Sequence, residues 1–492
     1  MRRARKLRLP CLTQVYWTGR SEHDGPVRGY KPGGHRCGPT VPIRSAVGRD
    51  IRSSGNHPGS EACERRSRPV STAAERDSQG GEHPAPRTPS AAGAGNQQSN
   101  QTQETSVRDM VEIGMGRTAR RTYELDDVNI VPSRRTRSSK QVSLSWQLDA
   151  YRFEIPFLTH PTDALVSPEF AVQLGKLGGL GVINGEGLWA RHADVAAKID
   201  QLLELVNKGG YERAIGLLQE LHAAPMQPDL LAAAVAHVRA AGVTVAVRVS
   251  PQNARTLTPA LVQAGIDLLV VHGTIISAEH VGDGEPLNLK TFIAELDVPV
   301  VAGGVSDHRT ALHLMRTGAA GVIVGYGSTP GATTTGEVLG IGVPMATAIA
   351  DAAAARRDYL DETGGRYVHV IADGQIANSG QLAKAIACGA DAAMLGYPLA
   401  VAAEAPGRGW YWPSAAAHPS VPRGALLPVD EGWLDDEDSG ELVQPSLERV
   451  LYGPSDDPFG SLNLVGGLRR SMAKAGYSDL KEFQKVGLSV RA

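Results

Sequence analysis

Two short apolar runs of the sequence end in a glycine next to a polar residue. Asp373 is followed by Gly374 and Gln375, and Gly396 is followed by Tyr397. Glycine lets backbone N–H groups approach a phosphate closely, and a carboxylate at the end of a buried strand can accept hydrogen bonds from a ribose diol. These five residues are predicted to bind an anionic, sugar-containing substrate. The alternative for Asp373 is a carboxylate that only caps a turn or a helix.

Two histidines end other apolar runs. His272 lies near the end of the run 267–273, and His160 ends the run 155–160. An imidazole at such a position could act as an acid or base near pH 7, or contact a bound cofactor. It could equally be a histidine satisfied by the backbone, and His160 is the weaker candidate of the two.

A third run leads into Gly325, Tyr326 and Gly327. The spacing partly matches a dinucleotide fingerprint, but the third glycine is absent and no acidic residue ends a strand about 20 residues further on. The three residues are candidates for cofactor contact.

These candidates all follow members of one series of short apolar runs that alternates with helical stretches. The eight runs are 155–160, 179–184, 243–250, 267–273, 298–304, 321–325, 368–374 and 392–396. The predicted helices between them are 168–177, 228–241, 256–264, 289–296, 307–317, 343–357 and 378–388. Eight βα units predict a (β/α)8 TIM barrel, whose active site lies at the carboxyl ends of the strands. A doubly wound open sheet is the alternative. Residues 185–228 and 402–462 are predicted insertions.

Composition separates the first 109 residues from the rest. Residues 1–109 carry 18 Lys and Arg against 10 Asp and Glu, and the remainder carries 32 against 42. The first stretch is rich in Gly, Ser, Pro and Arg and is predicted to be a disordered basic extension, with the folded domain at 110–492. A basic tail for nucleic acid is the alternative to a dispensable extension. The overall charge of -2 predicts no nucleic-acid or membrane partner.

The number and position of the cysteines bear on the cellular compartment and on metal binding. Only one of the four cysteines, Cys388, lies beyond residue 109. This argues against a disulfide scaffold and a Cys-based zinc or iron–sulfur site, so a cytoplasmic protein without a metal site is predicted. No apolar run reaches the length of a membrane helix.

Several stretches in the same order resemble the IMP dehydrogenase/GMP reductase family, and most closely the bacterial members without inserted CBS modules. They are 123–138 (YELDDVNIVPSRRTRS), 321–349, 370–400 and 464–476. The resemblance implies a purine mononucleotide as substrate, NAD or NADP as cofactor, and a homo-oligomer, commonly a tetramer. It also implies a loop cysteine that attacks C2 of the purine.

This sequence departs from that pattern at the loop. The position of the cysteine corresponds to Ala332 or Thr333, and a threonine hydroxyl needs an adjacent base to become a nucleophile. The resemblance implies catalytic roles for Thr333, Thr335 and Glu404, the latter two as the Thr–Glu pair of the reductase side. The implied binding residues are, for the substrate, Gly331 besides the five above, and, for the cofactor, His272, Gly273, Thr274, Gly325, Tyr326 and Gly327.

Three functions remain open from sequence. The first is an oxidoreductase acting on IMP, XMP or GMP with a nicotinamide cofactor but without the cysteine. The second is a catalytically silent paralogue that binds purine nucleotides in a regulatory or partner role. The third, by fold analogy alone, is a flavin-dependent barrel oxidoreductase.

Overall fold

The computed structural model describes residues 110–274, 276–278, 286–326, 336–419, 425–429, 434–435 and 442–491. Contacts divide the chain into Met1–Ala91 and Ala92–Ala492, and all described residues belong to the second unit. The predicted disordered extension at 1–109 lies outside the described residues.

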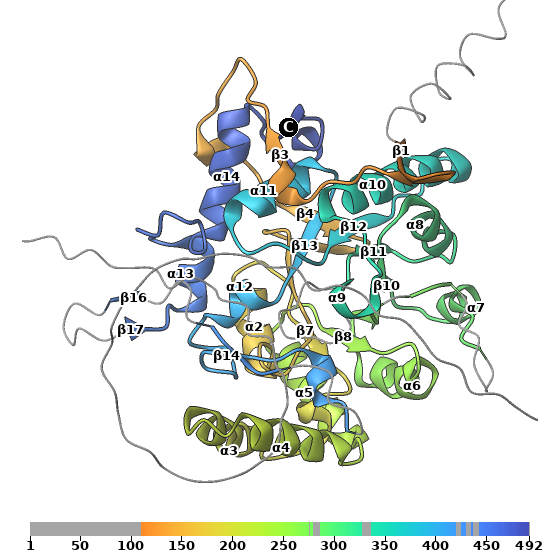
Figure 1. Cartoon of the computed structure of the whole chain (residues 1–492). Helices are drawn as coiled ribbons and strands as arrows, with labels where there is room; N and C mark the ends of the chain where they lie inside the picture. The colour runs from red at the N-terminus through yellow and green to blue at the C-terminus, as the bar shows by residue number, and fades with distance from the viewer. Residues whose placement is uncertain are drawn as a thin grey trace, which may run out of the picture. The chain divides into compact units, whose positions relative to one another are not determined.

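Eight parallel strands form the centre of the described unit (Figure 1). They are β6 (Phe157–Thr159), β7 (Val182–Asn184), β8 (Ala246–Val249), β9 (Leu268–His272), β10 (Val300–Val305), β11 (Gly321–Val324), β12 (His369–Ala372) and β13 (Ala392–Leu395). Each predicted run overlaps one strand, and β10 continues one residue beyond its run, to Val305. The order β6-β13-β12-β11-β10-β9-β8-β7 is completed by a parallel bridge between Leu158 and Leu180, which brings the β6 and β7 ends together. The TIM barrel is therefore confirmed over the open sheet.

Helices cover the outside of the strands, which explains why the strand sequences are apolar on both faces. The predicted helices are α2 (Pro168–Lys176), α5 (Pro228–Ala240), α6 (Ala254–Ala264), α7 (Leu289–Ala294), α8 (His308–Met315), α10 (Met345–Thr363) and α11 (Ser379–Ala387). Helix α10 extends six residues beyond the predicted end, to a C-cap at Gly364, which has a left-handed φ of 68°. The insertion 185–228 contains α3 (Val195–Asn207) and α4 (Tyr211–Ala223), which pack together.

A hairpin of β4 (Trp146–Leu148) and β5 (Tyr151–Phe153) lies at the amino end of the barrel. Leu148 is fully buried, and the Trp146 indole donates a hydrogen bond to the Ile155 carbonyl at 2.9 Å. At the ends of the domain, β3 (Val128–Ile130) pairs antiparallel with β18 (Leu488–Val490).

The segment after β13 begins with the short helix α12 (Tyr397–Ala400) and the strand β14 (Trp410–Tyr411), which pairs with β15 (Leu427–Pro428). Helices α13 (Leu447–Tyr452), α14 (Leu464–Ala475) and α15 (Leu480–Phe483) follow, and α14 packs on α11 and α13. Short elements are β1 (Met110–Gly114), β2 (Arg117–Arg120), α9 (Gly336–Leu339), β16 (Leu434–Asp435) and β17 (Leu442–Val443). Within the described ranges, no helix combines the length and the apolar character needed to cross a bilayer.

Candidate active site

A cavity of about 470 Å³ opens at the carboxyl ends of the strands. All five residues that the strand-end pattern predicted for substrate binding line it: Asp373, Gly374, Gln375, Gly396 and Tyr397. Its other lining residues are Glu124, Leu125, Asp126, Asp127, His160, Ile376, Ala377, Gln381, Met394, Pro398 and Tyr411. The size is in the range of small-molecule sites.

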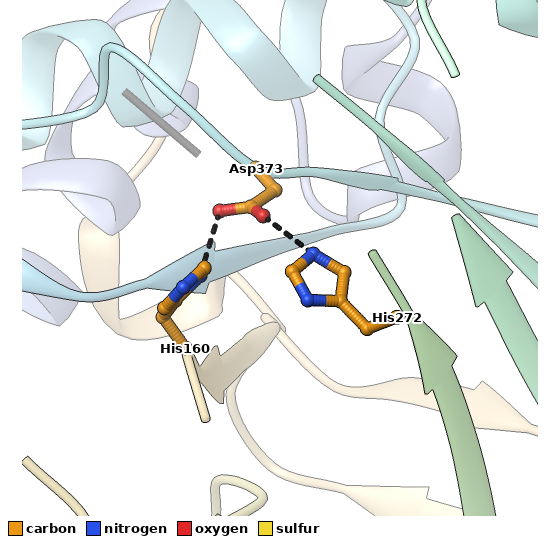
Figure 2. A group of neighbouring side chains, drawn as sticks. All are labelled: His160, His272 and Asp373. Atoms are coloured by element: carbon orange, nitrogen blue, oxygen red, sulfur yellow. Dashed lines mark hydrogen bonds and ion pairs between the residues drawn. The ribbon is translucent and has the colours of Figure 1, made fainter. Parts of the chain in front are cut away.

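Three buried polar side chains from different strands lie close together (Figure 2), and two of them, His160 and Asp373, line this cavity. His160 follows β6, His272 ends β9, and Asp373 follows β12; they are 8%, 7% and 3% exposed. His160 Nδ1 lies 3.4 Å from Asp373 Oδ1, and His272 Nε2 lies 3.2 Å from Oδ2. The two imidazole rings are nearly perpendicular, with centroids 5.3 Å apart. One carboxylate therefore serves two histidines, and we call this group the His–Asp–His cluster.

Burial and the neighbouring groups shift the pKa of Asp373 in opposite directions. Burial alone raises the pKa of Asp373, but its interactions with His160 and His272, hydrogen bonds among them, hold it well below the usual range. The pKa of His272 is lowered, chiefly because burial penalises the charged imidazolium. Near neutral pH Asp373 is thus ionised and His272 is neutral, so His272 donates its Nε2–H to the carboxylate.

The main chain around the cluster is fixed by neighbouring strands. Arg248, in β8, donates from Nη2 to the His272 carbonyl at 2.8 Å and lies 3.8 Å from Glu186. The His160 backbone N–H donates to the Leu395 carbonyl at 2.8 Å. Both histidines are therefore held by the barrel and not by a loop.

The described candidates for cofactor contact do not line the cavity. His272 turns its ring toward Asp373, and the Tyr326 hydroxyl is hydrogen-bonded to Ser306. Gly273, Thr274 and Gly325 lie at the same barrel end, after β9 and β11. Gly327 lies outside the described residues.

The predicted catalytic residues are only partly described. Gly331, Thr333 and Thr335 lie outside the described residues. Glu404 does not line the cavity; its Oε2 accepts a hydrogen bond from the Leu447 N–H at 2.8 Å, at the start of α13. That carboxylate already has a structural partner.

Cys388 follows the last residue of α11, at the amino end of β13 and so at the opposite end of the barrel from the cavity. Burial raises the pKa of its thiol to about 11. It is an unreactive thiol near neutral pH, as expected for a small residue packed against the core.

The sequence did not predict one wall of the cavity, nor the contact of His160 and His272 with Asp373. Glu124, Leu125, Asp126 and Asp127 come from the segment before β3, which was recognised only as a family resemblance. The Asp-Asp pair within that segment was the available signal. Nothing in the sequence spacing indicated that His160 and His272 would share Asp373.

Comparisons with known proteins point to one family. The model of the "IMP dehydrogenase / GMP reductase domain" family matches residues 122–491. An "uncharacterized oxidoreductase" of Mycolicibacterium smegmatis is 77% identical over 383 residues, which are 77% of this chain and 100% of that protein. Inosine-5'-monophosphate dehydrogenase of Aquifex aeolicus is 35% identical over 237 residues, 47% of this chain and 46% of that enzyme.

A solved structure is also similar to this chain. The crystal structure of an IMP dehydrogenase/GMP reductase-like protein from Corynebacterium glutamicum has 57% sequence identity to this chain and a TM-score of 0.72. The match covers 79% of this chain and 99% of that one.

Proposed function

The chain belongs to the IMP dehydrogenase/GMP reductase family, and from that premise we propose that it is an oxidoreductase acting on a purine mononucleotide. Its nucleotide, such as IMP, XMP or GMP, binds in the cavity at the carboxyl ends of the strands. Hydride passes between the purine and NAD or NADP, and the working protein is a homo-oligomer.

The observation that carries this proposal is the convergence of the strand-end residues on one cavity. Asp373, Gly374 and Gln375 follow β12, while Gly396 and Tyr397 follow β13, its neighbour in the barrel. In TIM-barrel enzymes a phosphate is frequently bound by the loops after strands seven and eight, which are β12 and β13 here. Gly374 has a φ of 144°, a conformation that glycine adopts readily.

Asp373 can hold sugar hydroxyls while it holds the histidines. Each carboxylate oxygen carries two lone pairs, so accepting one hydrogen bond from each histidine leaves two further acceptor positions. Because the group is ionised, hydrogen bonds to it are charge-assisted and stronger than neutral ones. Asp373 therefore binds and orients the ribose in this proposal.

The nicotinamide part of the proposal rests on family membership. A nicotinamide cofactor supplies a ring carbon that accepts or donates a hydride. His272, Gly273, Thr274, Gly325 and Tyr326 lie at the same barrel end as the cavity but not on its wall, and no cofactor cleft is defined by the described residues. We derive no chemical step through the cofactor from these residues.

A silent nucleotide-binding role is the second candidate, and the position of Cys388 favours it. Its thiol lies at the end of the barrel remote from the cavity and has a raised pKa. The segment 321–349, which resembles the active-site loop of the family, contains no cysteine. A nucleotide could therefore bind without being converted by cysteine attack.

Calorimetric titration of the full chain with IMP, XMP and GMP, each with and without NAD(H) and NADP(H), tests the proposal. We expect one nucleotide to bind and one cofactor to tighten it, with a change of nicotinamide absorbance on turnover. Binding without any cofactor effect or turnover would support the silent role. Absence of nucleotide binding would overturn both candidates.

The variant Asp373→Asn tests whether the nucleotide binds in this cavity. We expect at least about tenfold weaker binding, because charged hydrogen bonds contribute roughly 1.5–3 kcal/mol. Asp163→Asn is the matched control, since Asp163 is equally buried, pairs with His222 at 3.0 Å and does not line the cavity. Equal nucleotide affinity in both variants would contradict the placement.

A further inference from the structure

We propose that the His–Asp–His cluster of His160, His272 and Asp373 binds a single first-row transition-metal ion, such as Zn²⁺ or Fe²⁺. The sequence predicted no metal site. Within the described ranges, this is the one group of three or more His, Cys, Asp or Glu side chains whose ligand atoms come together closely enough to bind an ion. Those atoms all lie within 4.8 Å of one another.

Two of the three separations between these atoms fit a shared ion better than a pair of strong hydrogen bonds. The two N···O distances are 3.4 and 3.2 Å. Strong N–H···O hydrogen bonds centre on about 2.9–3.0 Å. Ligand atoms of a tetrahedral ion with bonds of about 2.0–2.1 Å lie about 3.3 Å apart. The third separation, between the nitrogens of His160 and His272, is no more than 4.8 Å, so an ion bound by all three groups would draw the two imidazole rings closer together.

The donor set selects the class of ion. Two imidazole nitrogens and one carboxylate oxygen with open positions are the ligand pattern of catalytic zinc sites and of non-haem Fe²⁺ sites. Magnesium and calcium prefer oxygen ligands alone. Because His160 and Asp373 line the cavity, the open positions of the ion would face the space that the nucleotide occupies in the proposed function.

The barrel holds the three ligands before any ion arrives. His272 is anchored through its carbonyl by Arg248, and His160 through its N–H by Leu395. The Asp373 N–H donates to the Val324 carbonyl at 2.7 Å. Ligands carried on three strands of one closed sheet lose little conformational entropy when the ion binds, and this favours affinity.

The charge of the cavity also favours a cation. Its lining residues include four carboxylates, Glu124, Asp126, Asp127 and Asp373, and no lysine or arginine. Such a surface attracts a divalent cation. The metal site does not require the nucleotide.

The test uses the full chain, stripped with a chelator and titrated by calorimetry with Zn²⁺ or, without oxygen, Fe²⁺, and with Mg²⁺ for comparison. Co²⁺ serves as a spectroscopic substitute, because its visible absorption reports nitrogen coordination and geometry. We expect one site per chain that is absent from His160→Gln and His272→Gln, or weakened by at least about a hundredfold. Mg²⁺ is expected not to compete for it.

His222→Gln is the matched control, because His222 is buried and pairs with a single aspartate. Its metal binding should equal that of the wild type. Cys11, Cys37 and Cys63 can bind zinc elsewhere in the chain, so the difference between variants identifies the site. Circular dichroism of each metal-free variant checks its folding.

Two results would overturn the metal site: a wild-type chain that binds none of these transition ions, or binding that His160→Gln and His272→Gln leave unchanged in folded protein. If the variants do not fold, the Co²⁺ spectrum of the wild type decides alone, since a spectrum without nitrogen coordination excludes the cluster. The titration contains no nucleotide. Metal binding can therefore succeed while the proposed nucleotide function fails, and the reverse.

Discussion

Two buried aspartates at opposite ends of the barrel differ in how their charge is satisfied. Asp391, at the amino end before β13, accepts hydrogen bonds from Arg356 at 2.7 Å and Lys481 at 2.6 Å, and others from Tyr367, Gln484 and the Val370 N–H. Asp373, at the carboxyl end, has the two histidines. The first is a completed structural network, whereas the second retains capacity for a ligand.

His369, beside the Asp391 network, makes stability depend on pH. Burial lowers its pKa to about 4, whereas the unfolded residue titrates near 6.5. Between these values the unfolded chain binds more protons, so stability falls as pH is lowered through this window, by up to about 3 kcal/mol. Urea unfolding at several pH values from 7.5 to 4 measures this loss.

His369→Gln should flatten the dependence in that window, and His313→Gln, which changes an exposed histidine of α8, is the matched control. Burial also lowers the pKa of His272, which contributes to the pH dependence of stability as well, so the informative quantity is the difference between variants. The same slope in His369→Gln and the wild type would contradict this assignment.

At the scale of elements, the strand–loop junctions leave little room for side chains. Gly325 follows β11 with a φ of 105°, and a Cβ there would lie 2.1 Å from the Asp373 carbonyl oxygen. This packing brings the β11 and β12 ends together and helps to place Asp373. The same junctions were recognisable in sequence, because glycine directly after an apolar run is a local pattern.

Gly325→Ala is expected to cost about 2 kcal/mol or more in unfolding free energy, because backbone strain and a backbone clash add. Gly364→Ala is the matched control: it also has a left-handed φ, of 68°, but no neighbouring atom within 4 Å. Its cost should be only about 1 kcal/mol. Denaturant unfolding of both variants measures the difference, and equal losses would show that the close approach is unimportant.

At the scale of the whole molecule, the amino end of the barrel is tied to the C-terminal helices. Lys481, in α15, pairs with Asp391, and Asp391 also holds Arg356 of α10. Strand β18, near the C-terminus, pairs with β3, near the start of the described domain. These ties stabilise the barrel at its amino end, and Asp391 does not line the cavity at the carboxyl ends of the strands.

Asp391→Asn is therefore expected to cost about 3 kcal/mol in stability, since it leaves the buried Arg356 guanidinium without its charge partner. Nucleotide and metal affinities of the folded variant should not change. Asp358→Asn, in an exposed pair with His308, should cost less than about 1 kcal/mol. Unfolding curves and calorimetry measure both, and a loss of ligand affinity in folded Asp391→Asn would contradict the separation of the two ends.

The sequence by itself determined the eight strands, the barrel and the strand-end residues Asp373, Gly374, Gln375, Gly396 and Tyr397. These depend on local signals: apolar runs buried on both faces, and glycines at the turns that follow. The family was also recognisable, because several stretches match it in order.

Only the tertiary structure decided that His160, His272 and Asp373 form one cluster, with Glu124, Asp126 and Asp127 on the wall of the same cavity. The members come from the first, fourth and seventh strands, more than 100 positions apart along the chain. Closing the barrel turns the carboxyl ends of its strands toward a common centre. Residues remote in sequence therefore meet there, and no local pattern encodes which side chains fill the space between them.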